Sequence, residues 1–289
     1  MSETITLKLS HRDEDKLYDA WKDCPGRTPP YAKWQLRPEN CVITCYESGK
    51  TVFQGKDAAV YAAPFSSAAP EASVPVQQDI LPQAGSDEVG TGDYYGPVCV
   101  CAAAVSEENI DLLRKLGVRD SKKLSDAQIL SAVPEFIDLV PHSLLILPPE
   151  KYNEVHSQNN MVAVKCLLHN QAYVHLSKKT ELPSLRVIDQ FVSEKSYYRY
   201  LRGTPEVVRG IHFETKAEDK YPAVAAASLI ARYAFLKSME QMSEQYGVVF
   251  PKGAGKNADA FTASFTARHG RDVLAKTAKI HFKNTEKIK

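Results

Sequence analysis

The feature that most restricts how this chain can fold is the stretch at residues 66–84, SSAAPEASVPVQQDILPQA, which shows neither helical nor strand periodicity. Ala, Ser, Pro and Gln dominate it, a composition typical of an exposed, semi-extended linker. Patterned sequence lies on both sides, and 289 residues suffice for two domains. The chain is therefore predicted to form a small unit over residues 1–65 and a larger one over residues 85–289.

The first unit has the pattern of a small α+β domain. Residues 4–10 alternate as a strand does, and residues 11–24 have the spacing of an amphipathic helix. Residues 40–59 indicate two strands joined through Glu-Ser-Gly-Lys, followed by a helix that ends near Tyr61. The expected order is strand, helix, hairpin and helix.

Aromatic and basic side chains of this unit are candidates for contact with nucleic acid, through base stacking and phosphate neutralisation. They are Tyr31, Lys33, Trp34, Arg37 and Lys50. In the alternative interpretation, Tyr31 and Trp34 pack the small core, and these residues alone favour that alternative.

The second unit alternates strands and helices. Strands are expected at about 83–89 and 95–105, on either side of GTGDYYG, where they would pair as a hairpin. Three more strands are predicted in SLLILPP, LRVIDQF and VVRGIHFE, with helices over 107–116, after Ser125, over 161–178 and from Pro222 onward. A hairpin followed by such alternation predicts a mixed α/β sheet flanked by helices.

Carboxylates occur in three places where a core is expected. Asp87 and Glu88 end the first strand of the larger unit. Asp189 ends an apolar run, and Lys-Ala-Glu-Asp at 216–219 precedes an Ala-rich helix. Ligands gather at strand ends and at loops that enter helices in α/β sheets, so the three places can converge. Spacing alone leaves scattered structural acids as the alternative.

A shared site for these acids would favour divalent cations. Adjacent strand residues point to opposite faces, so Asp87 and Glu88 share a site only if the strand ends there, an ending that Gly90 and Gly92 make plausible. Converging carboxylates repel one another unless a cation neutralises them. Their hard oxygens suit Mg²⁺ or Mn²⁺ rather than zinc, and two such ions can promote phosphodiester cleavage.

Other classes of site lack their patterns. GSDEVGTG and KGAGKN do not have the spacing of a phosphate-binding glycine loop, and the eight histidines form no HExxH or paired ligand spacing. His169 and His175 are accordingly expected at a helix surface or core edge. Six cysteines without a CxxC pair favour reduced thiols in the cytoplasm. No apolar run approaches the length of a membrane span, so no membrane partner is expected.

Five motifs in a fixed order carry a resemblance to a known family. They are GSDEVGTGDYYGP, DSKKLS, VIDQF, KAED with AVAAASLIAR, and PKGAGK with AKIHFKNT, spread over residues 85–285. Together they resemble type 2 ribonucleases H, and specifically the bacterial ribonuclease HIII group. YAKWQ and YESGKTVFQG in the first unit are also similar to the TATA-binding-protein-like domain of that group.

The resemblance implies an architecture and an activity. Residues 85–289 would form an RNase H-like mixed sheet flanked by helices, with a basic helical C-terminal region. Residues 1–65 would form a TATA-binding-protein-like substrate-binding domain, joined by the linker at 66–84. The implied activity is endonucleolytic cleavage of the RNA strand of RNA/DNA hybrids with two Mg²⁺ or Mn²⁺ ions, leaving 5′-phosphate and 3′-hydroxyl ends. A monomer is implied as well.

The resemblance also assigns the acids. Asp87, Glu88 and Asp189 fall on the first three catalytic and metal-binding carboxylates of the family. The fourth follows Lys-Ala before the Ala-rich helix, which selects Glu218 and leaves Asp219 as the alternative.

Ribonuclease HII is the nearest alternative identity. It usually carries Gly-Arg-Gly where this chain has Gly-Thr-Gly at 90–92, and it lacks the N-terminal domain. It also uses a C-terminal tyrosine to recognise a single ribonucleotide at a junction, and residues 251–289 contain no Tyr. The sequence therefore favours activity on longer ribonucleotide tracts. A non-catalytic nucleic-acid-binding homologue is a second alternative, disfavoured by the retention of all four acids.

Substrate contacts are expected in three segments. Backbone amides of Gly90, Thr91 and Gly92 can approach a ribose closely, and the 2′-hydroxyl distinguishes RNA from DNA. Ser121, Lys122 and Lys123 look like phosphate contacts, with a solvated basic loop as the alternative. Residues 251–289 carry nine Lys and Arg against three Asp and Glu. Four lysines there are expected to neutralise backbone phosphates: Lys252, Lys256, Lys279 and Lys283.

Overall fold

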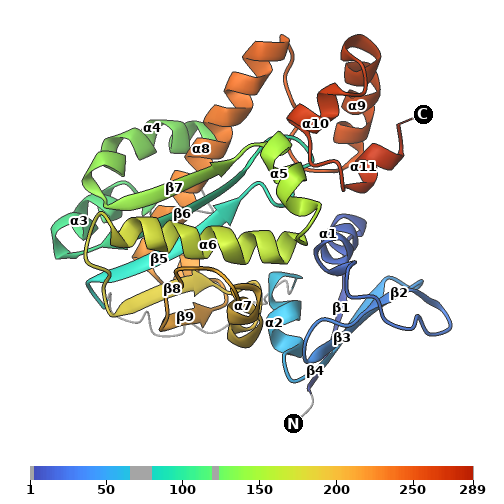
Figure 1. The fold of residues 1–289 in the computed structure, drawn as a ribbon, viewed down its shortest axis with the longest axis horizontal. Coiled ribbons are helices and arrows are strands. Elements are labelled where there is room, and N and C mark those ends of the chain that lie inside the picture. Colours follow the sequence, from blue (N-terminus) through green and yellow to red (C-terminus); the bar gives the residue numbers. More distant parts are fainter. Residues whose placement is uncertain (1–2, 66–79, 119–123, 289) are drawn as a thin grey trace.

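The structure is a computed structural model that describes residues 3–65, 80–118 and 124–288. Most of the predicted linker, and the predicted phosphate contacts Ser121, Lys122 and Lys123, lie outside the described residues. Two sheets dominate the molecule, and Figure 1 shows the smaller one, in blue, beside the larger one. No helix in the described ranges is both long and apolar enough to cross a membrane.

The N-terminal unit is a four-stranded antiparallel sheet in the order β1-β4-β3-β2. Its elements are β1 (Glu3–Lys8), α1 (His11–Trp21), β2 (Ala32–Leu36), β3 (Cys41–Tyr46), β4 (Lys50–Gly55) and α2 (Ala58–Ala62). The predicted strand, helix, hairpin and helix are confirmed, because β3 pairs with β4 across a turn in which Gly49 has a positive φ. The prediction does not include β2, whose flanking prolines interrupt the strand pattern.

Helix α1 illustrates how the local sequence builds this unit. The Ser10 hydroxyl accepts a hydrogen bond from the Asp13 backbone N–H at 3.2 Å and so caps the helix. Leu17 and Trp21 lie one turn apart on its buried face. The Trp21 ring meets Tyr61 of α2 edge-on, with ring centroids 5.1 Å apart, so an apolar stripe joins the two helices.

The larger unit contains a five-stranded mixed sheet in the order β7-β6-β5-β8-β9. Its strands are β5 (Gln83–Val89), β6 (Val98–Val105), β7 (His142–Leu147), β8 (Leu185–Asp189) and β9 (Ile211–Glu214). β5, β6 and β7 pair antiparallel, whereas β8 runs parallel to both β5 and β9. The predicted hairpin and the mixed sheet are therefore confirmed.

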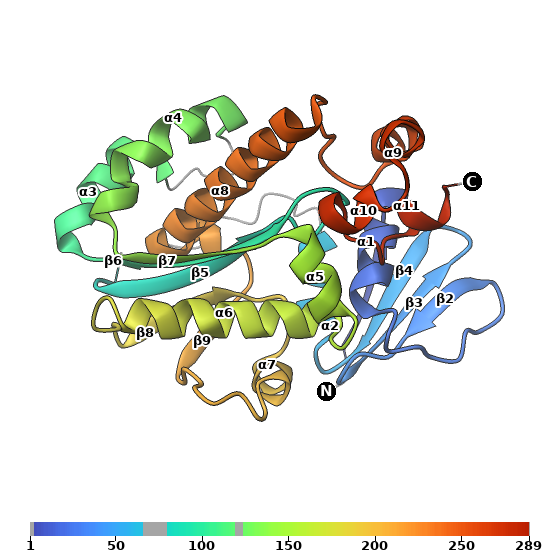
Figure 2. The same cartoon turned by 45° about the horizontal axis from the view of Figure 1, so that its top comes forward.

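Helices cover both faces of this sheet. Figure 2 shows α8 (Pro222–Tyr246) on one face and α6 (Met161–Ser177) on the other. At Gly85 of β5, a Cβ atom would lie only 2.3 Å from the Val224 backbone nitrogen. Glycine is thus required for the first turn of α8 to lie directly on β5, near the beginning of the strand.

The other helices surround this core. They are α3 (Glu107–Lys115), α4 (Asp126–Phe136), α5 (Pro149–His156), α7 (Glu194–Tyr200), α9 (Lys256–His269), α10 (Val273–Thr277) and α11 (Lys283–Glu286). The predicted cap at Ser125 is confirmed, since its hydroxyl accepts from the Gln128 N–H at 3.3 Å. Pro222 begins α8 as expected. The prediction does not include α5 or α7, which are short.

The two units dock through polar contacts. The Glu39 carboxylate accepts the Ser196 hydroxyl at 2.6 Å and pairs with Arg199 at 2.6 Å and Lys195 at 3.1 Å, all three on α7. On the other side, Lys22 Nζ donates to the His281 carbonyl at 2.9 Å. These contacts place the N-terminal unit at the end of the larger sheet where β5 and β8 finish.

Candidate active site

The predicted acids meet at one edge of the larger sheet. β5 and β8 are parallel neighbours, and their pairing runs only as far as Ser86 opposite Ile188. Asp87 and Asp189 are the next residues on the two strands, so their side chains leave the sheet at the same edge. Glu218 is buried in the short 3₁₀ helix η4 (Ala217–Asp219), which leads into α8.

The raised pKa values of two of these carboxylates indicate that the acids lie close together. Burial, together with the negative charges of Glu88 and Asp189, raises the pKa of Asp87 well above its usual range. Burial and then Glu218 raise the pKa of Asp189 to about 7. Asp87 and Asp189 therefore lie close enough to other carboxylates to repel them, an arrangement that a bound cation would stabilise.

The geometry also distinguishes Glu218 from its neighbour. The Ala217 N–H donates to Asp189 Oδ1 at 2.9 Å, which ties η4 to the end of β8. Lys216, just before it, adopts a left-handed conformation that turns the chain into η4. Glu218 is consequently buried beside Asp189, whereas Asp219 is exposed. A cavity of about 270 Å³ opens here, lined by Asp189, Lys216, Glu218 and also Pro64 of the N-terminal unit.

Asp87 and Glu88 occupy opposite faces of β5. Ser228 of α8 hydrogen-bonds the Asp87 carboxylate, whereas the Glu88 carboxylate contacts Lys165 and His169 of α6. β5 remains paired with β6 through Val89, so the strand ends at this point only on its β8 side. Within the described ranges, no three carboxylates or other His, Cys, Asp or Glu ligands are arranged to hold a metal ion directly.

The surroundings of Glu88 are built from α6. His169 is fully buried, and its Nε2 lies 2.7 Å from Glu88 Oε2 while its Nδ1 lies 2.8 Å from Ser86 Oγ. Lys165 Nζ contacts the other Glu88 oxygen. Burial alone would raise the pKa of Glu88, but Lys165 and the His169 hydrogen bond lower it to about 2. The pKa of Glu88 is thus shifted in the opposite direction to the pKa values of Asp87 and Asp189.

Lys165 and His169 are site residues that the sequence analysis missed. The expectation of a surface or core-edge role for His169 is wrong, because its ring bridges Ser86 and Glu88 in the interior. The available signal was the i, i+4 spacing of a lysine and a histidine on one face of a long helix. Nothing in that spacing identified the partner, which comes from another element.

The Gly-Thr-Gly loop follows directly from the acids. Gly90 has φ +95°, and a Cβ atom there would lie 2.2 Å from the Pro97 carbonyl oxygen, so only glycine fits. Thr91 and Gly92 line a cavity of about 250 Å³ together with Lys165 and with Lys16 of α1. The N-terminal unit therefore contributes to the space beside the loop.

The basic residues of the C-terminal region differ in position. Lys256 is exposed at the first position of α9, Lys252 pairs with Asp126, and Lys283 lies 3.6 Å from Asp15 of α1. The expectation for Lys279 is wrong. It is fully buried, and its Nζ donates to the Asp93 and Gly96 carbonyls at 2.9 and 2.6 Å. Burial lowers the pKa of Lys279 to about 8, and its role is to anchor the C-terminal segment.

The candidate contacts of the N-terminal unit lie in or next to the edge strand β2 and at the β3–β4 hairpin. Figure 1 shows β2 on the side of its sheet that is far from the larger sheet. Tyr31 is 81% exposed, so the expectation that it packs the core is wrong. Trp34 is half-buried and packs against Tyr18, with ring centroids 5.6 Å apart, as that interpretation predicted. Lys33 pairs with Glu14 at 2.6 Å, and Arg37 and Lys50 are exposed.

Comparison with known proteins relates the chain to a single enzyme class. A family model described as Ribonuclease HII matches residues 84–285, and a model described as Domain of unknown function (DUF3378) matches residues 4–77. The chain is 42% identical to a protein of Bacillus subtilis (strain 168) named Ribonuclease HIII, covering 98% of this chain and 95% of the relative. It is also 42% identical to a Ribonuclease HIII of Listeria monocytogenes serotype 4b (strain CLIP80459), over 90% of this chain and 89% of that one.

A solved structure gives the same result. The crystal structure of Bst-RNase HIII in complex with Mn²⁺ superposes with a TM-score of 0.71 at 37% identity, covering 99% of this chain and 97% of the other. The likeness extends over both units, so the overall architecture of the chain, a mixed sheet flanked by helices with a second smaller domain, has a solved counterpart.

Proposed function

Because the chain belongs to the ribonuclease HII family, in its ribonuclease HIII group, we propose that the four clustered carboxylates form its catalytic centre. The protein is an endoribonuclease that cleaves the RNA strand of RNA/DNA hybrids. The observation that carries the site assignment is the convergence of Asp87, Asp189 and Glu218, with Glu88 behind them, at the edge where β5 and β8 end.

The donor set fits divalent cations. All four groups are carboxylates, whose hard oxygens suit Mg²⁺ or Mn²⁺. The raised pKa values of Asp87 and Asp189 indicate that the cluster carries more negative charge than its surroundings neutralise. The solved structure of Bst-RNase HIII contains Mn²⁺, which supports the same type of ion here. Two such ions, when bound, would activate the attacking water and stabilise the leaving oxygen.

The chain's own residues orient the reaction. Asp87 and Asp189 supply carboxylates fixed by Ser228 and by the Ala217 N–H, and Glu218 adds a third from η4, lining the same cavity as Asp189. Rigid supports of this kind reduce the reorganisation needed on substrate binding. Hydrolysis at this site would leave a 5′-phosphate and a 3′-hydroxyl.

Substrate recognition is assigned to the loop at 90–92. The loop follows Asp87 and Glu88 directly in the chain, and at Gly92, where a Cβ atom would meet only the Lys16 side chain at 3.5 Å, the backbone is open to a ribose whose 2′-hydroxyl marks RNA. Lys256, which is exposed, and Lys252, which pairs with Asp126 in the free protein, are the proposed contacts to backbone phosphates. The N-terminal unit, over residues 1–65, acts as a substrate-binding domain. Its four-stranded antiparallel sheet with two helices supports a TATA-binding-protein-like relationship.

The catalytic assignment is tested by cleavage of a labelled RNA/DNA hybrid in Mg²⁺, with wild type run beside Asp87→Asn. Loss of cleavage in the variant is expected, since one ligand charge is removed without a change of shape. If the two proteins cut alike, the carboxylate site is wrong. A protein that binds the hybrid but leaves it intact in both forms would be a non-catalytic homologue.

Specificity for tracts is tested with a duplex that contains one embedded ribonucleotide. We expect poor cleavage of it beside efficient cleavage of a continuous hybrid, because residues 251–289 carry no tyrosine to recognise a junction. Efficient cutting at the single ribonucleotide would instead indicate a ribonuclease HII-like enzyme.

Gel filtration of the same preparation tests the expected monomer.

A further inference from the structure

The Glu88 carboxylate already has a cation beside it. Lys165 Nζ contacts Glu88 Oε1, and both side chains are only 12% exposed. The ammonium also sits over the Phe191 ring, 3.8 Å from its centroid, which fixes it from the other side. This is a partly desolvated ion pair inside the carboxylate cluster, unlike the exposed pairs elsewhere on the surface.

The two oxygens of Glu88 have different partners. Oε2 lies 2.7 Å from His169 Nε2, and the Nδ1 of the same ring is hydrogen-bonded to Ser86 Oγ. Oε1 has the lysine, whose long stem comes from α6 and ends at the cavity shared with Thr91 and Gly92. The histidine is therefore enclosed, whereas the ammonium has open space toward the substrate loop into which it can move.

We propose that Lys165 is the resident counter-ion of Glu88, which a divalent cation must displace before it can use that carboxylate. The proposal rests on the metal site proposed above. A positive charge about 4 Å or less from a binding oxygen opposes a second cation strongly in a partly buried site. Lys165 thus keeps the cluster stable without metal and lowers the affinity of the free protein for divalent ions.

Displacement also connects the metal to the substrate. The cavity beside Thr91 and Gly92, into which the ammonium would move, is where we place the sugar-phosphate backbone of the hybrid. A phosphate there would pair with the Lys165 ammonium after it leaves Glu88. Binding of the hybrid and of the divalent ion would then favour each other, and linkage requires the effect to be reciprocal.

The test is calorimetric titration of Mn²⁺ into the full-length protein without substrate. Lys165→Met keeps the apolar stem over Phe191 and removes the charge, so Mn²⁺ affinity should increase roughly tenfold. Lys165→Arg keeps the charge and should bind Mn²⁺ as wild type does. Thermal unfolding verifies that each variant is folded, and Lys165→Gln replaces Lys165→Met if the latter is not.

Three results would either contradict the displacement of Lys165 by a metal ion or show that the proposed metal site itself is wrong. Unchanged or weaker Mn²⁺ binding by folded Lys165→Met would show that the ammonium does not compete with the metal. A higher KM for hybrid with unchanged Mn²⁺ affinity would make Lys165 a phosphate contact only. Asp87→Asn serves as the control for the premise: if it binds Mn²⁺ as tightly as wild type, the proposed metal site itself fails, whatever Lys165 does.

Discussion

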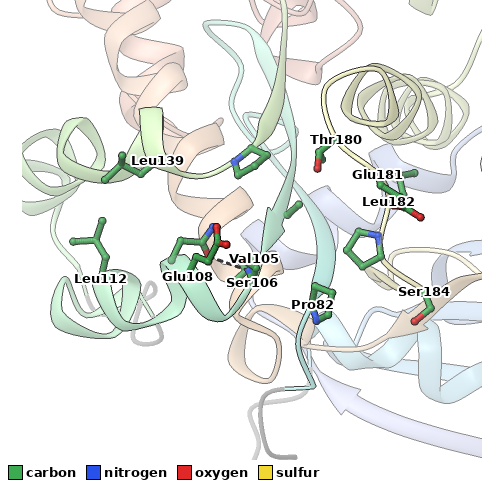
Figure 3. Close-up of a pocket in the computed structure, with 14 residues that line it drawn as sticks. Pro82, Val105, Ser106, Glu108, Leu112, Leu139, Thr180, Glu181, Leu182 and Ser184 are labelled. Atoms are coloured by element: carbon green, nitrogen blue, oxygen red, sulfur yellow. Dashed lines mark hydrogen bonds between the residues drawn. The ribbon is translucent and has the colours of Figure 1, made fainter.

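The two ends of the five-stranded sheet differ in a way that locates the chemistry. At the end where β5 and β8 begin, a cavity of about 780 Å³ is lined by prolines, leucines and loop residues (Figure 3). Its two carboxylates, Glu108 and Glu181, are exposed. At the opposite end the cavities are about 250 and 270 Å³. Lys165, the partner of Glu88, lines the first, and Asp189, whose pKa is raised to about 7, lines the second with Glu218. Buried, unneutralised charge therefore marks the site better than available volume does.

The largest expected effect distinguishes Glu218 from its neighbour Asp219, at the end of the sheet that holds the clustered acids. Glu218→Gln should lower kcat for hybrid cleavage by about 10²–10³-fold, because it removes a buried ligand charge. Asp219→Asn is the matched control, since that side chain is exposed, and it should stay within about twofold of wild type. Steady-state cleavage of a labelled hybrid in Mg²⁺ measures both. The reverse ranking would move the fourth acid to Asp219.

The next effect concerns the domain docked at this end. Deletion of residues 1–65 should raise KM for hybrid roughly tenfold to a hundredfold while changing kcat far less, because tethered binding surface is lost but the acids remain. Circular dichroism of the truncated protein controls for folding. An unchanged KM would assign the N-terminal unit another role.

A smaller effect should appear in stability against pH. Asp189 has a pKa of about 7 when folded, above the value of about 3.8 expected in an unfolded chain, so the folded state holds its proton longer. Without metal, stability should fall as pH rises from about 4 to 7, by up to about 4 kcal/mol. Thermal unfolding in chelator across this range measures it. Asp189→Asn should make the profile less steep, with the remaining slope due to Asp87, and a profile that rises with pH in both proteins would contradict the assignment.

The smallest effect is expected at the other end of the sheet. Leu139 lines the large cavity and is 61% exposed. The substitution Leu139→Ser should therefore change the rate of hybrid cleavage by less than about twofold. Steady-state kinetics on the same hybrid tests this. A loss comparable with that of Glu218→Gln would mean that the large cavity takes part in the reaction and that the contrast between the two ends is wrong.

The sequence predicted most of the secondary structure, because strand alternation, helix caps and turn residues depend on neighbouring positions in the chain. The alternation around GTGDYYG, the cap at Ser125 and the proline that begins α8 each act within a few residues, and the structure confirms them. β2 and the short helices α5 and α7 were missed, because five to eight residues give little periodicity and their stability comes from tertiary packing.

The sequence by itself determined the family and nominated the candidate acids, with Asp219 left as an alternative to Glu218, since motif order and residue type are written along the chain. It could not determine which way those acids face. Only the tertiary structure directs Asp87 toward α8 and Glu88 toward α6, and brings Lys165 and His169 from a helix far along the chain to Glu88. It also buries Lys279, which the charge pattern alone placed on the surface. Contacts between distant segments and the desolvation of charge arise from packing, and neither is encoded at any one position.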